Sequence, residues 1–196
     1  MAEVHGPQRL GPLTPLVGTW EGNVGLDVSF RHEIDEVTRT SYFERFTFAP
    51  IPAQHNGSQT LEGLKYTNQA WRHGEEAMNP FHDEVGYMLW DEVRGLIMRP
   101  VVFGRGIAIL AGSSAGPRDP KLVFKATPGE PHFGILQNPY LTDNAELLGF
   151  ESIITFVDET TFSYTQNLML KMDAMGGEKL DHTDENTLHR VDDGRS

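Results

Sequence analysis

Two histidines of this chain stand beside carboxylates, and these residue types could form a metal site. The two runs are Asp181-His182-Thr183-Asp184 and His82-Asp83-Glu84. An imidazole nitrogen and carboxylate oxygens can together bind a hard or borderline metal ion. The spacing matches no standard metal motif, and an acidic turn can also hold a histidine by hydrogen bonds alone. A direct metal site and a purely structural histidine therefore both stay open at each position.

A second candidate is a tryptophan set between glycines, in the run Gly18-Thr19-Trp20-Glu21-Gly22-Asn23-Val24-Gly25. Glycine in a strand lets the backbone bend sharply or lets another chain approach closely. A tryptophan ring buries a large apolar area. The residue types of Gly18, Trp20 and Gly22 suit packing at one end of a barrel, and contact with a ligand is the alternative.

The composition excludes several kinds of function. The chain has no cysteine, so disulfides, thiolate catalysis, cysteine-ligated zinc and iron–sulfur clusters are excluded. With 28 acidic and 16 basic residues, the formal net charge is −12. Such a surface repels phosphate backbones and anionic lipids, so we expect neither nucleic acid nor membrane as a partner. The N-terminus lacks a signal-peptide pattern, and no run of 18 apolar residues exists, so we expect a cytoplasmic protein.

The elements that must position these residues are strands. Residues 160–172 alternate between apolar and polar side chains, with Gln166 as the exception on the apolar face, and residues 146–157 behave similarly. Such a period of two indicates a strand with one buried face. Further strands are expected at 16–25, 41–49, 60–72, 85–90, 94–102, 105–112, 121–126 and 184–192. Longer loops are expected at 53–58 and 128–139, and a single helical turn at 13–17.

About ten short strands joined mainly by tight turns favour one all-β domain. Closing them into an antiparallel up-and-down β-barrel removes the exposed edges. Because eight strands already suffice to enclose a small ligand, a barrel of about ten strands predicts an internal ligand cavity. The expected organisation is an N-terminal arm at residues 1–12 and a barrel at residues 13–192.

The order of the motifs resembles a known family. The run Leu13-Thr14-Pro15-Leu16-Val17, followed by the Trp20 strand, is similar to the start of the nitrobindin-like haem-binding barrels, which are calycin-type and fatty-acid-binding-protein-like. The family shows Gly-x-Trp-x-Gly-x-Gly, and this chain has one extra residue before the last glycine. Its His-x-Glu-x-Gly-Tyr strand resembles His82 to Tyr87. Its final histidine, followed by Leu-x-Arg, matches His182, although the interval to Leu188 is one residue longer here.

This resemblance, to a longer bacterial branch, implies a cofactor and a chemistry. His182 would be the axial ligand of a ferric haem b, and His82, Trp20, Gly18 and Gly22 would belong to the haem pocket. Haem iron takes one nitrogen of a neutral imidazole, and the other nitrogen needs an acceptor, for which Asp181 and Asp184 are candidates. The opposite face of the haem would be apolar. Nitrobindins bind nitric oxide and are proposed to isomerise peroxynitrite to nitrate, so the same reactivity is expected here.

Two other functions stay open. A non-enzymatic carrier of a fatty acid or other apolar molecule needs the cavity but no iron ligand. A small enzyme acting on an organic substrate would be favoured by an inward-facing carboxylate paired with His82. The expected partner in each case is a small molecule, and a homodimer stays open.

Overall fold

The computed structural model describes residues 10–75 and 79–191. Three short helical segments occur there: the 3-10 helices η2 (Gly11–Leu16) and η3 (Asp173–Met175), and α1 (Pro139–Asn144). The first five strands are β1 (Gly18–Arg31), β2 (Glu36–Asn56), β3 (Gln59–Arg72), β4 (His82–Asp91) and β5 (Leu96–Phe103). The others are β6 (Ile107–Ser114), β7 (Lys121–Ala126), β8 (Ile135–Gln137), β9 (Ala145–Phe156), β10 (Thr161–Met172) and β11 (Glu178–Val191).

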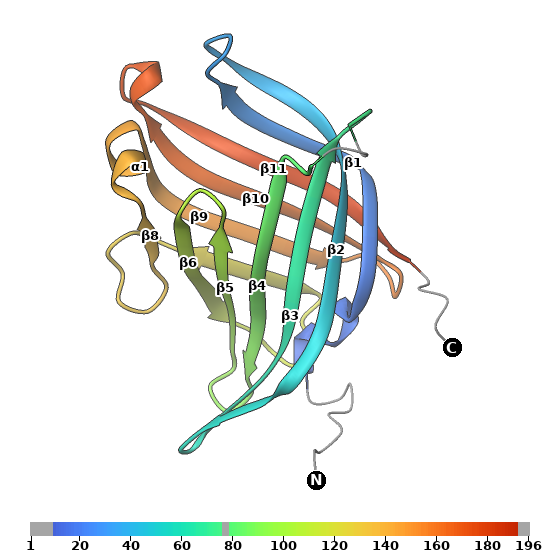
Figure 1. The fold of residues 1–196 in the computed structure, drawn as a ribbon. Helices are drawn as coiled ribbons and strands as arrows, with labels where there is room; N and C mark the ends of the chain where they lie inside the picture. Colours follow the sequence, from blue (N-terminus) through green and yellow to red (C-terminus); the bar gives the residue numbers. More distant parts are fainter. Residues whose placement is uncertain (1–9, 76–78, 192–196) are drawn as a thin grey trace.

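These strands form a closed antiparallel barrel (Figure 1). The order in the sheet is β5-β4-β3-β2-β1-β11-β10-β9-β7-β6-β8, and pairing of β5 with β6 closes the ring. Ten strands make the barrel, and β8 is an extra strand paired with β6. The predicted fold class is thus confirmed. Within the described ranges, no helix is long and apolar enough to cross a membrane.

Side chains alternate between the barrel interior and the outer surface along the strands, as the sequence predicted. In β10, Phe162 and Tyr164 are buried while Thr165 is exposed. In β11, Leu188 is fully buried and His189 is exposed on the outer side. The expected helical turn is also present, because η2 covers residues 11–16.

Both longer loops predicted from the sequence are wrong in part. Residues 53–56 continue β2, which pairs with β3 up to Asn56↔Gln59. Most side chains there are exposed, so the segment lacks the apolar alternation that reveals a strand. The expected loop at 128–139 contains β8, and α1 begins within it at Pro139. Asn138 caps α1 by accepting a hydrogen bond from the Leu141 amide at 3.2 Å.

One end of the barrel is closed by η2, whose Leu13 and Leu16 are fully buried. Trp20 donates from Nε1 to the Leu16 carbonyl at 2.7 Å and packs edge-on against Phe162 at 4.9 Å. The Arg190 guanidinium lies 4.2 Å from the centre of the Trp20 ring. Residues 1–9 of the predicted arm and residue 192 lie outside the described residues.

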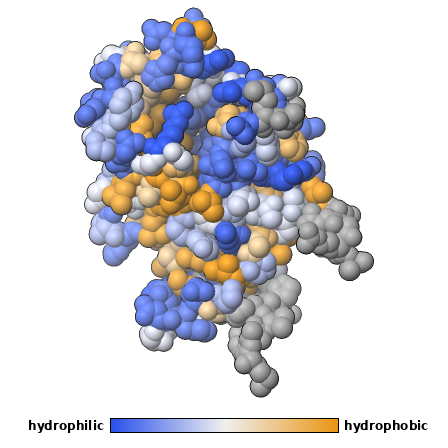
Figure 2. Space-filling view, viewed as in Figure 1, coloured by the Kyte–Doolittle hydropathy of each residue, from blue (hydrophilic) through white to orange (hydrophobic). Residues whose placement is uncertain are grey.

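The outer surface also carries apolar side chains. Figure 2 shows them gathered over the wall that contains β4, β5 and β6, where Val85, Val102 and Leu110 are exposed. Val85 is the direct cross-strand neighbour of Val102.

Candidate functional site

The end of the barrel opposite η2, which we call the mouth, holds His182 on the inner face of β11. Strands β10 and β11 pair without a register shift from Thr161↔His189 to Met172↔Glu178. His182 therefore lies on the same face as buried Leu188, six residues further along the strand. Its side chain is 29% exposed, so the imidazole is reachable from solvent at the rim of the interior.

Asp27 of β1 holds the His182 ring. The imidazole Nε2 lies 2.9 Å from Asp27 Oδ1, and Asp184 Oδ2 lies 3.9 Å from the same nitrogen. Ser29 donates to the other Asp27 oxygen at 2.7 Å. Of the two acceptors predicted from the sequence, Asp184 lies near the ring, whereas Asp181 is exposed and accepts a hydrogen bond from Asn167 instead. The carboxylate in hydrogen-bond contact with the ring comes from the distant strand β1.

A β-bulge in β1 turns Asp27 inward. The register with β2 shifts between Gly22↔Glu44 and Gly25↔Tyr42, so β1 has one residue more than β2 in this interval. Asn23 and Val24 are both exposed, and alternation resumes beyond them with Gly25 and Asp27 buried. The extra residue in the glycine–tryptophan motif is therefore absorbed by the bulge.

His82 opens β4 and also faces the mouth. Its Nε2 lies 3.3 Å from Glu84 Oε2, and its ring packs edge-on against Phe103 at 5.9 Å. Glu84 is completely buried, and its other oxygen contacts the Arg99 guanidinium at 2.6 Å. An inward-facing carboxylate is thus paired with His82, which is the arrangement that would favour a small enzyme.

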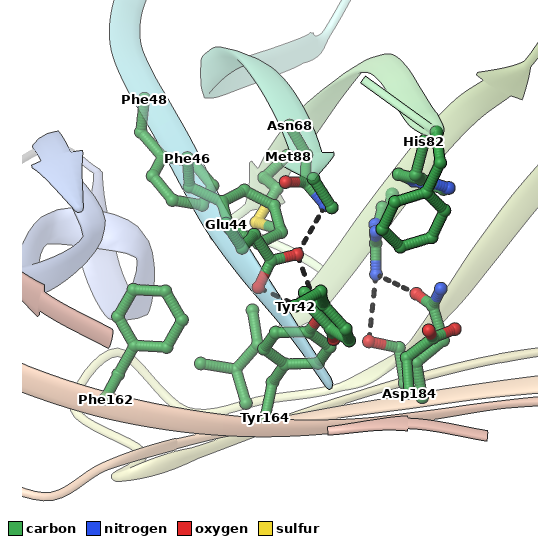
Figure 3. Close-up of a pocket in the computed structure, with 16 residues that line it drawn as sticks. Tyr42, Glu44, Phe46, Phe48, Asn68, His82, Met88, Phe162, Tyr164 and Asp184 are labelled. Atoms are coloured by element: carbon green, nitrogen blue, oxygen red, sulfur yellow. Dashed lines mark hydrogen bonds between the residues drawn. The ribbon is translucent and has the colours of Figure 1, made fainter. Parts of the chain in front are cut away.

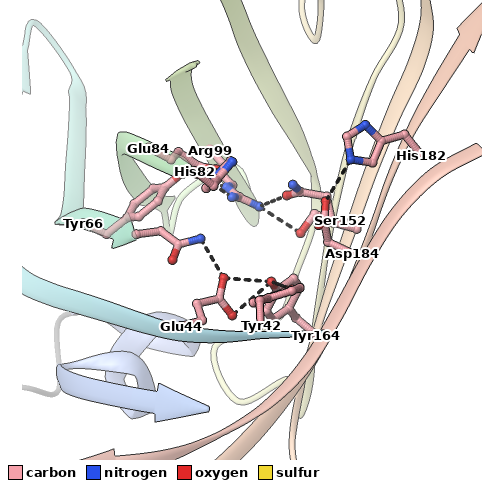
Figure 4. A network of polar contacts seen from close by, with 12 residues as sticks. Tyr42, Glu44, Tyr66, His82, Glu84, Arg99, Ser152, Tyr164, His182 and Asp184 are labelled. Carbon is pink, nitrogen blue, oxygen red and sulfur yellow. Dashed lines mark hydrogen bonds and ion pairs between the residues drawn. The ribbon is translucent and has the colours of Figure 1, made fainter. Parts of the chain in front are cut away.

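Below the two histidines lies a layer of buried polar side chains, which we call the polar floor (Figure 4). Arg99 crosses the interior, donating from Nη1 to Ser152 at 2.8 Å and to Gln166 at 3.0 Å. Its Nε donates to the Tyr66 hydroxyl at 2.8 Å. A charged network thus joins strands β3, β5, β9 and β10 across the interior, and the expected apolar face of a bound haem stays a prediction.

A second part of the polar floor surrounds Glu44 of β2. Its carboxyl accepts from Asn68 Nδ2 at 2.8 Å, from Asn186 Nδ2 at 3.1 Å and from the Tyr164 hydroxyl at 2.8 Å. The Tyr42 hydroxyl lies 2.8 Å from that of Tyr164. Figure 3 shows Tyr42, Glu44, Asn68 and Tyr164 around one hollow, which His82 and Asp184 also line.

The charges of the mouth are strongly coupled. Burial alone would lower the pKa of His182, but the Asp27 hydrogen bond and the Asp184 charge outweigh it and raise the pKa. Burial raises the pKa of Asp184 to about 6. Burial acts in the same direction on Asp27, but hydrogen bonds from His182 and Ser29 outweigh it and lower that pKa. A metal ion bound by His182 would have to displace the imidazole proton, because metals take the neutral ring.

The hollow has little free space. Its volume is about 490 Å³ including the part open to solvent, but room for whole water molecules amounts to only about 20 Å³. That corresponds to about one buried water. The buried Asn68 Oδ1, which lines this hollow, has no hydrogen-bond partner among the described residues. A large ligand must therefore sit in the mouth above the polar floor.

The donor set of the mouth fits a haem. His182 offers Nδ1, which has no hydrogen-bond partner among the described residues, while its Nε2 is held by Asp27. Leu168, the cross-strand neighbour of His182, and Leu170 face inward, are partly exposed and pack against the core. They would provide apolar contact for a macrocycle held beside His182.

The same carboxylates form, with His182, a second type of candidate site. Ligand atoms of Asp27, His182 and Asp184 all lie within 4.8 Å of one another. One imidazole and two carboxylates suit a hard or borderline ion. A non-haem metal ion would use the nitrogen that now faces Asp27.

The glycine–tryptophan motif lies at the opposite end of the barrel. Trp20 pairs with Arg190, eight residues along β11 from His182, which is roughly 26 Å at the rise of a strand. A Cβ on Gly22 would come within 2.6 Å of the Thr187 carbonyl, and one on Gly18, where φ is +121°, within 2.8 Å of Arg190. These contacts show close packing, and the structure does not bring the three residues to His182. Their part in binding a cofactor stays a prediction.

Sequence reasoning missed Asp27 and the polar floor. The polar floor did leave a signal, because its members interrupt the apolar face of their strands: Glu44 between Tyr42 and Phe46, Arg99 between Ile97 and Val101, and Gln166 between Tyr164 and Leu168. Asp27 left none, since its inward direction depends on the bulge.

Comparisons with known proteins agree with this architecture. Two curated relatives are the peroxynitrite isomerases of Clavibacter michiganensis subsp. michiganensis (strain NCPPB 382) and Clavibacter sepedonicus. Each is 33% identical over 81 residues, which cover 41% of this chain and 35% of the relative. The chain thus matches about a third of the length of these relatives.

Among solved structures, Rv2717c from M. tuberculosis aligns with a TM-score of 0.64 at 21% identity, covering 97% of this chain and all of that one. This likeness shows the fold. The family model that matches is the THAP4-like, heme-binding beta-barrel domain, and it spans residues 9–190. The chain therefore belongs to the family of THAP4-like, heme-binding beta-barrel domains.

Proposed function

We propose that the mouth binds haem b with His182 as the axial ligand, and that the bound haem acts on nitric oxide or peroxynitrite. The observation that carries the proposal is the half-buried imidazole of His182, whose Nδ1 is available in a haem-binding family barrel. When bound, ferric haem would supply an iron centre for small nitrogen oxides. The likeness to peroxynitrite isomerases over 81 residues supports this class of substrate.

The test is a hemin titration followed by absorbance. Wild-type protein is expected to give the Soret band of a histidine-ligated haem, and His182→Ala to lose that band or shift it strongly. His189→Ala is the matched control, because His189 lies on the same strand but faces outward. A nitrosyl spectrum and faster conversion of peroxynitrite into nitrate would then support the proposed reactivity. If hemin gives no such band, or if both variants behave like wild type, His182 is not the ligand.

The carrier of an apolar molecule has less support. The interior below the mouth is filled, and the polar floor would place Arg99 and Glu44 against a hydrocarbon chain. A hydrocarbon chain that entered this level would separate these groups from their hydrogen-bond partners without replacing the contacts.

A second candidate function rests on the pair of His82 and Glu84. A buried carboxylate 3.3 Å from an imidazole can orient that ring for proton transfer to a substrate in the mouth. His82→Ala would then abolish turnover of such a substrate without changing hemin binding. Loss of hemin binding in this variant would instead assign His82 to the haem pocket.

A further inference from the structure

We propose that Asp27 is the positioning residue of His182, which holds Nε2 and so presents Nδ1 of the imidazole to the ligand in the mouth. The inference rests on the proposed function for the identity of that ligand, which is haem. The contact itself, 2.9 Å between Nε2 and Asp27 Oδ1, is a feature of the chain alone.

The sheet register makes this contact specific. Asp27 is the direct cross-strand neighbour of Asp184, and Val28 is that of Thr183, so the inner face of β1 runs past the inner face of β11 beside His182. Asp27 faces inward only because β1 carries the bulge at Asn23 and Val24. Without it, the alternation that turns Trp20 inward would turn Asp27 outward. The contact between Asp27 and His182 therefore depends on the bulge.

Asp27 is itself fixed. Its residue is 7% exposed, and its second oxygen accepts the Ser29 hydroxyl at 2.7 Å. A carboxylate held in this way has one orientation toward the ring. Asp184, at 3.9 Å, is too far for a hydrogen bond to Nε2. The chain Ser29–Asp27–His182 thus determines both the tautomer and the direction of the imidazole.

A carboxylate partner also changes the ligand that it holds. It increases the basicity of the coordinating nitrogen, and loss of such a partner typically weakens metal affinity about 10–100-fold. We therefore expect Asp27→Asn to weaken hemin affinity about 10–100-fold while histidine ligation is kept. In the ferrous protein, the iron–histidine stretching band should move to lower frequency, because the imidazole loses negative character.

Two variants serve as comparisons. Asp181→Asn is the matched control, because Asp181 neighbours His182 on β11 but is exposed and bonded to Asn167, and it should leave both readouts unchanged. Asp184→Asn asks which carboxylate acts. If Asp184→Asn lowers the stretching frequency and Asp27→Asn does not, the assignment to Asp27 is overturned.

The ring can also be followed without haem. Imidazole ¹⁵N shifts at alkaline pH should show His182 protonated on Nε2 in the wild type, with a weaker preference in Asp27→Asn, because an amide oxygen is a weaker acceptor than a carboxylate. Ser29→Ala, which removes only a hydroxyl, should show a smaller effect in the same direction and covers the case in which Asp27→Asn fails to fold.

The outcomes separate the two proposals. If hemin does not bind but the tautomer depends on Asp27, the proposed function fails and the positioning role stands. If hemin binds through His182 while neither the band nor the tautomer responds to Asp27→Asn or Ser29→Ala, the positioning role is wrong and the function stands.

Discussion

Glu44 and Glu84 are two buried glutamates in one barrel, and they are stabilised in opposite ways. Both are 1% exposed. Glu44 receives hydrogen bonds from neutral donors only: two amides and a tyrosine hydroxyl. Glu84 contacts the Arg99 guanidinium, the Tyr66 hydroxyl and the His82 ring. The carboxyl of Glu44 thus has only neutral partners on one side of the polar floor, whereas that of Glu84 has a cationic partner on the other side.

The difference appears in their protonation. Burial raises the pKa of Glu44 to about 7, and its three donors do not offset that cost. Burial acts on Glu84 in the same direction, but the Arg99 charge and the bonds from His82 and Tyr66 lower its pKa to about 2. A full positive charge within hydrogen-bond distance therefore achieves what three neutral donors do not.

Removing that cation should give the largest effect. Arg99→Met leaves the buried Glu84 carboxylate without its ion-pair partner, and breaking such a pair typically costs about 3–5 kcal/mol. Urea unfolding at neutral pH should show a fall of this size in the free energy of unfolding. The double variant Arg99→Met, Glu84→Gln should recover much of it, since no buried charge then remains unpaired. An unchanged urea midpoint in Arg99→Met would show that Glu84 does not depend on Arg99.

The pH dependence of stability should separate the two carboxyls. Glu44 binds its proton more tightly in the folded state, so its contribution is complete below pH 4.5 and is lost as pH rises toward about 7. The difference between the folded-state and unfolded-state pKa of Glu44 corresponds to about 3 kcal/mol in the free energy of unfolding. Glu84 acts in the opposite sense, because its contribution is present above pH 4.5 and is lost as pH falls toward about 2.

Glu44→Gln should therefore flatten the decline in stability between pH 4.5 and about 7, and should leave the acid limb below pH 4.5 in place. The measurement is a series of urea unfolding curves across this range, with wild type beside the variant. A decline that persists in Glu44→Gln would assign it to another group, such as Asp184, whose pKa is also raised, to about 6.

The sequence predicted the frame of this site but not its contacts. Period-two alternation in β9 and β10 marks strands with a buried face, and that pattern, with the turn signals between strands, predicts a barrel. The inward direction of His182 was expected only from the resemblance to the haem-binding barrels. The position of Asp27 could not be predicted, because it is 155 residues from His182 and its direction depends on a bulge. Pattern reasoning assigns one face to each residue by parity, and a bulge reverses that parity.

The polar floor was missed for a different reason. Hydrophobic periodicity treats a polar residue on the apolar face as an irregularity, as with Gln166 in β10. Here several such irregularities lie at the same level of the barrel and satisfy one another, with Gln166 and Ser152 both accepting from Arg99. A lone irregularity carries little information, whereas their shared level appears only once the register of neighbouring strands is known.

The smallest expected effect comes from removing one of the neutral donors to Glu44. While Glu44 is ionised, Tyr164 donates to it and its oxygen can accept from Tyr42, which also donates to the Glu185 carbonyl at 3.3 Å. Tyr164→Phe therefore removes a donor to the carboxyl and an acceptor for Tyr42. The loss should be about 1.5 kcal/mol above pH 7, where Glu44 is ionised, and smaller at about pH 5, where it is protonated. Tyr42→Phe keeps all donors to Glu44 and should show less dependence on pH. Equal losses for Tyr164→Phe at both pH values would mean that Glu44 does not change its charge between them, which would remove the contrast with Glu84.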